Sequence, residues 1–240
     1  MEDVMPRSLS GGFMFAALAV SLFVVGSESA QAQQSLVFNF GQFSVRGEDT
    51  RVVDDVLLEN LTLFAFDIRD FNSMNTGVEW LISAGEYFDA GLGVGFYQRT
   101  VPSVYTDFIN DDGSELFQDF RLRVVPLTAI IRVIPFGRNA AVQPYFGVGV
   151  GLFNWRYSEV GEFIDFDTFD VFHGRFTASG RNVGGLMLGG FRVPVGDRFS
   201  AGLEVRYQSA IGRVGLDQGF LNERIDLGGI AAQVTFQVDF

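Results

Sequence analysis

The sequence predicts an all-β fold, an eight-stranded antiparallel transmembrane β-barrel with short turns at one end and long loops at the other. Three observations support this prediction. Eight segments alternate between apolar and polar residues, and the connections between them are strongly unequal in length. Residues 33–240 also contain no apolar run of the roughly 18 residues that a membrane-spanning helix needs.

The alternation identifies the strands, because successive side chains of a strand point to opposite faces of the sheet. In residues 87–99, for example, Phe88, Leu92 and Phe96 share one face and Asp89 lies on the other. A strand that crosses a membrane needs about 9 to 11 residues. The eight predicted strands cover residues 36–45, 74–83, 87–99, 119–136, 142–152, 180–195, 199–208 and 230–240.

The connections between these strands are alternately long and short. The predicted turns cover residues 84–86, 137–141 and 196–197, and the predicted loops cover 46–73, 102–118, 157–179 and 209–224. Short periplasmic turns and long extracellular loops are typical of outer-membrane barrels. A soluble lipocalin-like barrel also has eight alternating strands. The unequal lengths of the connections favour a membrane barrel over this soluble barrel.

The composition excludes several classes of protein. The net charge is -12, and a nucleic-acid partner is not expected because phosphate binding needs a basic face. The chain has no Cys, which excludes disulfides and Cys-ligated metals, and no cofactor is expected. Charged residues make up 19% of the chain, below the roughly 25% of a typical soluble domain, and this low fraction favours a protein that lies in lipid.

The N-terminal segment has the pattern of a signal peptide. Residues 13–25 are an apolar run that is too short to span a membrane as a helix, and Ala30 and Ala32 flank Gln31 in a small-x-small cleavage pattern. We expect cleavage of residues 1–32, which leaves residues 33–240 as one barrel domain. The acids at positions 2 and 3 suit a signal peptide poorly, so Met5 is an alternative start to Met1. An uncleaved membrane anchor is the alternative to a signal peptide.

The C-terminal strand ends in Val234, Phe236, Val238 and Phe240, which alternate and finish on an aromatic residue. This pattern resembles the assembly signal of outer-membrane proteins. The chain therefore resembles the small outer-membrane β-barrel family, which includes OmpW and the transmembrane domain of OmpA. The resemblance implies a location in the bacterial outer membrane, contact with its lipid and lipopolysaccharide, and recognition by the barrel-assembly machinery through Phe240.

The interior of an eight-stranded barrel is just wide enough for side chains to fill. If the polar faces point inward, four acids and four arginines meet there. Buried charges are tolerated when they are paired, and the planar fork of arginine can bridge two carboxylates. We expect these residues to form a plug of ion pairs, with a proton or ion pathway as the alternative. They are Glu79, Asp89, Arg99, Arg132, Arg192, Glu204, Arg206 and Asp239.

The predicted loops carry most of the acidic residues. Residues 46–73 hold seven acids and three Arg, 102–118 hold four acids and no Arg, and 157–179 hold five acids and one Arg, so each has a net charge of -4. Such a surface attracts divalent cations, and one candidate cluster is close in sequence; a merely solvated acidic surface is the alternative. The cluster comprises Asp107, Asp111, Asp112 and Glu115.

The first predicted loop also contains apolar residues at positions 53, 56, 57 and 61, a spacing that suits an amphipathic helix. Thr50 or Asp54 is placed to cap this helix. A helix over the barrel mouth would line a pocket for a small hydrophobic molecule, as the resemblance to OmpW allows. A lid packed on its own loops is the alternative.

The sequence offers few candidate catalytic residues. His173 is the only histidine and lies in a predicted loop, with Thr177 and Ser179 as its nearest hydroxyls. We therefore expect a protein that is not an enzyme and has a structural or surface-interaction role. A conduit or binding barrel for a small hydrophobic molecule is the first alternative. A lipid A-modifying enzyme is the second.

Overall fold

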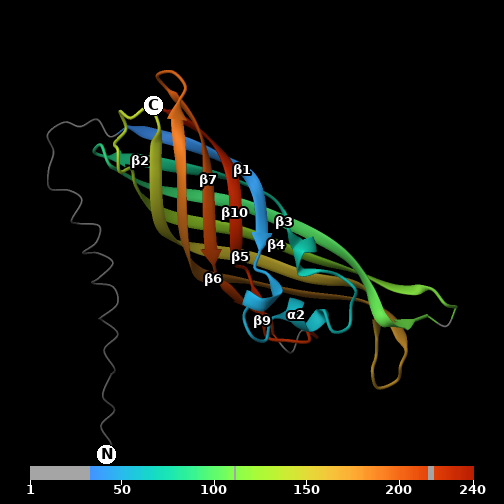
Figure 1. The fold of residues 1–240 in the computed structure, drawn as a ribbon. Coiled ribbons are helices and arrows are strands. Elements are labelled where there is room, and N and C mark those ends of the chain that lie inside the picture. The colour runs from blue at the N-terminus through green and yellow to red at the C-terminus, as the bar shows by residue number, and fades with distance from the viewer. Residues whose placement is uncertain (1–32, 111, 216–218) are drawn as a thin grey trace, which may run out of the picture. The chain divides into compact units, whose positions relative to one another are not determined.

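The computed structural model describes residues 33–110, 112–215 and 219–240. Eight strands form a closed barrel in the order β1-β10-β7-β6-β5-β4-β3-β2 (Figure 1). Every neighbouring pair is antiparallel, so the predicted fold class is confirmed. The predicted signal peptide and both start positions lie outside the described residues. The barrel strands are β1 (Gln34–Val45), β2 (Ser73–Ala84), β3 (Phe88–Ile109), β4 (Glu115–Val133), β5 (Gln143–Ile164), β6 (Val171–Pro194), β7 (Phe199–Ser209) and β10 (Gly229–Asp239).

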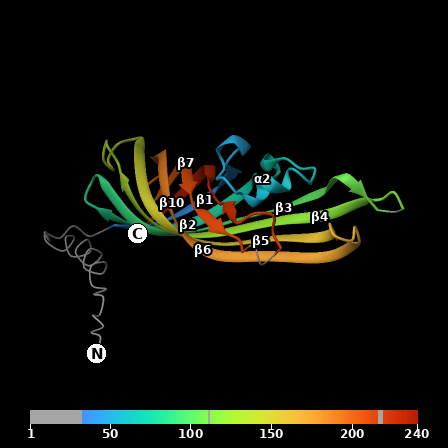
Figure 2. The same ribbon diagram turned by 90° about the horizontal axis from the view of Figure 1, so that it is seen from below.

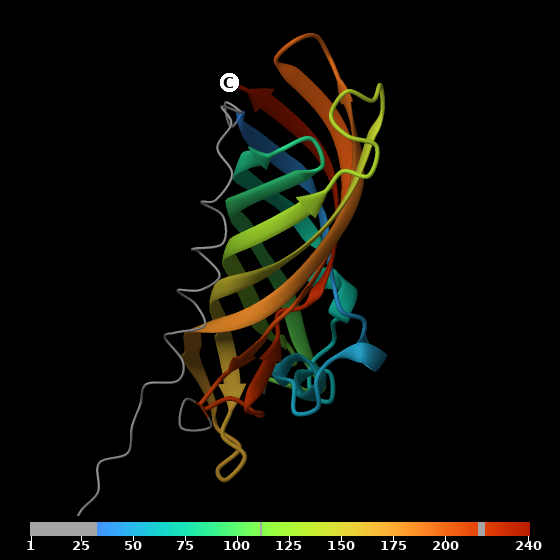
Figure 3. The same cartoon turned by 90° about the vertical axis from the view of Figure 1, so that its left-hand side faces the viewer.

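The shorter elements gather at the end of the barrel opposite the C-terminus (Figures 1 and 3). Among the described residues, no helix is both long enough and apolar enough to cross a membrane. The short elements are η1 (Glu48–Thr50), α2 (Val56–Asn60), η2 (Ile68–Phe71), β8 (Ile211–Arg213) and β9 (Arg224–Asp226).

The three short turns lie at the other end of the barrel, as predicted. Gly85, Gly137 and Gly196 have φ angles of 74°, 72° and 83° in these turns. Side chains with a Cβ rarely adopt this left-handed conformation, so glycine is favoured at each position. The turns close the β2–β3, β4–β5 and β6–β7 hairpins.

Two of the four predicted loops are wrong. Residues 102–118 and 157–179 mostly continue the strands, so β3, β4, β5 and β6 have 22, 19, 22 and 24 residues. This is about twice the length that a membrane crossing needs. The strands extend beyond the other four at the end away from the turns (Figure 2). Only residues 110–114 and 165–170 connect them at the tips.

The physical reason is a reversal of polarity along each long strand. On β4, Leu127 and Ile131 are 47% and 52% exposed on the outer face, while Arg132 is buried inside. Nearer the start of β4, at the end away from the turns, Arg121 faces outward and Leu122 is buried. The period of two residues is unbroken, but the inward face changes from polar to apolar. The part of the barrel nearer the turns therefore has an exterior suited to lipid. The parts of β3, β4, β5 and β6 that continue beyond the other four strands, which we call the extension, have an exterior suited to water.

An apolar core fills the inside of the extension. The inward face is apolar here, because aromatic side chains from β3, β4 and β5 point inward and the first loop packs against them. Tyr97 donates a hydrogen bond to the backbone oxygen of Phe71 in η2 and so attaches the loop to the wall. The principal aromatic members of this core are Phe43, Phe64, Phe71, Tyr97, Tyr105, Phe120, Phe153, Trp155 and Tyr157.

The predicted helix in the first loop is present but short. It begins at Val56 because the side chain of Asp55 caps it and accepts a hydrogen bond of 2.9 Å from the backbone nitrogen of Leu57. Thr50 and Asp54 were the predicted caps, and this prediction is wrong. Asp54 has a φ of 63°, which interrupts the helical path before Asp55.

Candidate functional site

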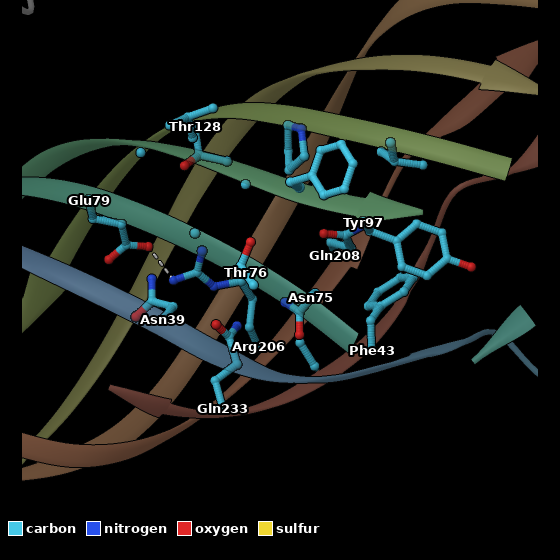
Figure 4. Close-up of a pocket in the computed structure, with 18 residues that line it drawn as sticks. Asn39, Phe43, Asn75, Thr76, Glu79, Tyr97, Thr128, Arg206, Gln208 and Gln233 are labelled. Atoms are coloured by element: carbon cyan, nitrogen blue, oxygen red, sulfur yellow. Dashed lines mark hydrogen bonds and ion pairs between the residues drawn. The ribbon is translucent and has the colours of Figure 1, made fainter. Parts of the chain in front are cut away.

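Four charged side chains form a closed ring across the lumen, in the part of the barrel nearer the turns. Arg132 of β4 donates to Glu79 of β2 and, at 3.0 Å, to Glu204 of β7. Arg206 of β7 donates to the same two carboxylates, at 2.6 Å to Glu204. Figure 4 shows the contact between Arg206 and Glu79. Each carboxylate oxygen of the ring accepts from one guanidinium, so two positive and two negative charges alternate.

The ring is almost completely removed from solvent. The side chains of Arg132 and Glu79 are each 2% exposed, that of Glu204 is fully buried, and that of Arg206 is 13% exposed. Isolated charges would be very costly at this depth, and opposite charges with matching hydrogen bonds reduce that cost. The strands β2, β4 and β7 are not neighbours in the barrel, so the ring joins distant parts of the wall.

Tyr145 of β5 completes the packing of the ring. Its hydroxyl donates to Glu204 at 3.1 Å, and the guanidinium carbon of Arg132 lies 4.9 Å from the centre of its ring. This distance is within the range of a cation–π interaction. Tyr145 alternates with the apolar residues of the predicted strand 142–152, but nothing in the sequence identifies it as a partner of the charges.

Glycines give the long charged side chains their room. A Cβ at Gly93 would lie 2.9 Å from Cγ of Glu79, and a Cβ at Gly147 would lie 3.1 Å from Cγ of Arg132. Contacts this short would force the charged side chains to shift. The rows of small residues on the inward faces of β3 and β5 thus accommodate the ring.

A second group of charges lies nearer to the turns. Asp89 of β3 accepts from Arg138 and, at 3.4 Å, from Arg192 of β6. Arg138 lies in the turn between β4 and β5, where the alternation that identifies strand faces makes no prediction. Its guanidinium also donates to the backbone oxygen of Phe88 at 2.8 Å.

Amide side chains extend this second group to the C-terminal strand. Arg192 donates to Gln143 and to Gln237, at 2.7 Å in both cases. Gln237 in turn donates to Asp239 at 2.6 Å. Asp239 is therefore connected to Arg192 through Gln237 and forms no ion pair with the described arginines.

Arg99 lies outside both groups, and its prediction as an interior ion pair is wrong. It is exposed at the level where the interior becomes apolar, and its Nε donates at 2.7 Å to the backbone oxygen of Asp70. No salt bridge joins it to a carboxylate of the described residues. The polarity reversal explains the difference, because at this height no carboxylate of the plug faces it.

A small cavity lies between the ring and the apolar core (Figure 4). Its volume is about 40 Å³, which is enough for about three water molecules. Glu79 and Arg206 bound it on one side and Phe43 and Tyr97 on the other. It also reaches Thr76 and Phe96 in the barrel wall.

Two buried aspartates tie the first loop to the fourth. Asp55 accepts from Arg51 at 3.0 Å and from the backbone nitrogen of Asp226 at 2.6 Å. Asp226 accepts from Arg46 at 3.0 Å. Burial raises the pKa of Asp55, while the guanidinium of Arg51 acts against this rise. The sequence gives no signal for the contacts of Asp226 with Asp55 and Arg46, which join residues more than 170 positions apart.

Glu159 of β5 is buried in the extension and forms no salt bridge with the arginines that the structure describes. Asn60 of α2 donates to it at 2.7 Å and Tyr157 donates at 2.9 Å. Burial raises the pKa of Glu159, and these two hydrogen bonds act against the rise. Glu159 belongs to a predicted acidic loop, and nothing in the sequence indicates that it holds α2.

The predicted cation cluster is not assembled by the described residues. Asp111 lies outside them, and no group of three or more carboxylate or histidine side chains in the described part of the chain is placed to hold a metal ion. Asp112 accepts from the backbone nitrogen of Ser114 at 2.9 Å and from its hydroxyl at 2.7 Å, and these bonds lower its pKa.

His173 lies in β6 and not in a loop. It is exposed, and its cross-strand neighbour is Glu162 of β5. Thr177 is four residues further along the same face, a separation of about 13 Å along a strand. The register therefore places no hydroxyl nucleophile directly opposite or beside His173 on this strand.

The predicted assembly signal ends β10. Val234 and Phe236 are exposed on the outer face, and the ring of Phe236 stacks on that of Phe199 at 5.8 Å. Phe240 is 65% exposed, and its backbone exchanges hydrogen bonds of 2.9 and 3.1 Å with Gln34 of β1. These bonds continue the pairing of β1 with β10 that closes the barrel.

Comparison with known proteins gives a likeness in fold. No protein-family model matches the chain, and no curated protein matches it in sequence. The solved structure of the outer membrane protein OprG from Pseudomonas aeruginosa matches with a TM-score of 0.50 and 13% identity, over 87% of this chain and 96% of that one. The match shows that the chain has the fold of a small outer-membrane barrel. The resemblance inferred from the sequence is confirmed at this level.

Two further structures match with lower scores. Neisserial surface protein A has a TM-score of 0.46 and 11% identity, over 89% of this chain and 100% of its own. The outer membrane protein W of E. coli has a TM-score of 0.44 and 11% identity, over 88% of this chain and 100% of its own.

Proposed function

We propose that the chain is an integral barrel of the bacterial outer membrane with a plugged lumen and a structural or surface-interaction role. The ring of Arg132, Glu79, Arg206 and Glu204 is the observation that carries this proposal. It fills the lumen of a barrel whose interior has room for little beyond side chains. The apolar exterior of the part of the barrel nearer the turns supports insertion in lipid.

The orientation follows from the connections. Short turns are periplasmic in outer-membrane barrels, so the extension and the first loop face the outside of the cell. Acidic segments there would attract divalent cations as diffuse counterions. The exposed Phe240 is free for recognition by the barrel-assembly machinery, and we propose no catalytic role and no cofactor.

Planar-bilayer conductance tests the plug. We expect the purified protein to insert without stable unitary currents. Insertion is checked separately, by co-flotation with liposomes and by the shift in gel mobility between heated and unheated samples. Stable unitary currents from inserted protein would contradict a plugged lumen.

A binding barrel for a small hydrophobic molecule is the second candidate. The observation that favours it is the cavity beside Phe43 and Tyr97, which reaches the wall near Phe96. There the β3–β4 register has no paired residues between Val94 and Tyr97. Replacing Phe43 with Trp gives a fluorescent reporter at this position. Saturable quenching by an apolar ligand, absent in a Tyr97→Trp protein with the cavity filled, would support this candidate over the structural role.

A further inference from the structure

Four outward-facing arginines form a patch on the wall of the barrel, which we call the arginine patch. Arg121 and Arg123 lie on β4, Arg156 on β5 and Arg181 on β6, and all four are exposed. Arg123 and Arg156 are direct cross-strand partners. Arg181 is the partner of Asn154, which lies two residues before Arg156 on the same face of β5. The patch thus spans three adjacent strands.

The patch is not neutralised by the protein. Among the described residues its guanidinium groups form no salt bridge, and the one hydrogen bond found runs from Arg121 to the hydroxyl of Thr100 at 3.0 Å. Like charges directly opposite one another on a sheet are destabilising. Four adjacent arginines therefore fit an external anion. The cross-strand neighbours of the patch are polar side chains that also donate hydrogen bonds: Gln98, Thr100, Asn154, Ser158 and Ser179.

The height of the patch on the barrel identifies the anion. Leu127, Leu152 and Val183 form a row of exposed apolar residues across the same three strands. Arg181 precedes Val183 by two residues, about 7 Å, and Arg123 precedes Leu127 by four residues, about 13 Å. The patch therefore lies immediately beyond the apolar belt, on the side away from the turns. This is the level of the lipid headgroups of the outer leaflet.

We propose that the arginine patch binds the phosphate groups of a phosphorylated glycolipid of the outer leaflet, that is, lipopolysaccharide. This inference rests on the proposed function, because it requires the barrel to span the outer membrane. The planar fork of arginine suits phosphate, and such charge-assisted pairs are among the stronger hydrogen bonds. The surrounding outer segments are acidic and repel anions in solution, so the lipid reaches the patch from the bilayer.

The test compares lipid binding by refolded proteins. Full-length mature protein is refolded in neutral detergent micelles, and retention of purified lipid A is measured by native mass spectrometry at increasing lipid concentration. The test variant is Arg121→Gln, Arg123→Gln, Arg156→Gln and Arg181→Gln together. The matched control replaces two exposed arginines of the first and fourth loops, Arg69→Gln and Arg213→Gln, which form no salt bridge among the described residues.

We expect the four-residue variant to bind lipid A at least about tenfold more weakly than the unmodified protein and the loop control. Lipid A without its phosphates should bind all three proteins equally weakly, and high salt should reduce the difference. Equal binding of lipid A by the variant and the unmodified protein would overturn the inference. Equally tight binding of phosphatidylglycerol would also overturn it, because the patch would then not select the glycolipid.

Failure of this inference is distinguishable from failure of the proposed function. Each protein is first tested for insertion into liposomes and for heat-modifiable gel mobility. A protein that does not insert overturns both proposals together. A protein that inserts and does not discriminate phosphorylated from dephosphorylated lipid A overturns the lipid site alone.

Discussion

Asn60 donates a hydrogen bond of 2.7 Å to the carboxylate of Glu159, and this contact joins α2 to the wall of the extension. Glu159 is 4% exposed, and this burial disfavours its charged form and raises its pKa. The folded state therefore holds a proton on Glu159 more tightly than the unfolded state does. As the pH rises from the ordinary pKa of a glutamate through this raised value, the stability contributed at Glu159 is lost.

Glu159→Gln is expected to stabilise the attachment of α2 at neutral pH by on the order of 1 kcal/mol. The amide keeps an oxygen that accepts from Asn60 and removes the cost of a buried charge. The unmodified protein should lose stability with rising pH relative to this variant, and the difference should vanish at low pH. Urea unfolding in micelles, followed by tryptophan fluorescence at several pH values, measures this difference. Glu115→Gln, at an exposed position of β4, is the control, and a pH dependence equal in both variants would contradict the prediction.

Asp55→Ala is expected to release the first loop without unfolding the barrel. The change removes the cap of α2, worth about 1 kcal/mol, and leaves the buried Arg51 without its carboxylate, at a cost of several kcal/mol. Hydrogen exchange should accelerate over residues 46–72 and stay unchanged in β4 and β5. Asp49→Ala, at an exposed position of η1, should leave exchange unaltered. Uniform acceleration across the barrel would show that the loop and the barrel unfold as one unit.

The strand segments nearer the turns could be predicted because the polarity of their two faces is constant there. In that part of β3, Ala90 and Leu92 lie on the apolar outer face and Asp89 faces the lumen. In the extension the same period of two continues with the faces exchanged. A prediction that expects the same face of each strand to be apolar along its whole length therefore assigns residues 102–118 to a loop.

The presence of charged side chains in the lumen could be predicted from the sequence, but the pairs that they form could not. Period-two alternation places Glu79 and Arg132 on the inward face, and the limited space of an eight-stranded barrel favours contact between them. Partners from outside the strands give no such signal. Arg138 reaches Asp89 from a turn, and Asp226 reaches Arg46 from the fourth loop, because the fold brings distant segments together.

Arg138→Gln is expected to lower the free energy of unfolding by about 1–2 kcal/mol. Asp89 would keep Arg192 at 3.4 Å but lose its shorter contact. The effect should be modest because the side chain of Arg138 is 18% exposed and water can replace part of the interaction. Urea unfolding in micelles provides the measurement. Arg198→Gln removes the same charge from an exposed position of the β6–β7 turn; equal losses in both variants would indicate a general charge effect and not the pair with Asp89.

Glu204→Ala is expected to destabilise the barrel by about 3–5 kcal/mol, because it leaves the two guanidinium groups of the ring with one carboxylate between them in a buried site. The double variant Glu204→Gln and Arg206→Gln removes one charge of each sign and should cost less than Glu204→Ala. The gel mobility shift measures this order: Glu204→Ala should convert to the unfolded form at a lower temperature than the double variant. Asp119→Ala, which removes an exposed acid from β4, should behave as the unmodified protein. If the double variant were the least stable protein of the series, hydrogen bonding and packing by Arg206, not charge balance, would hold the ring together.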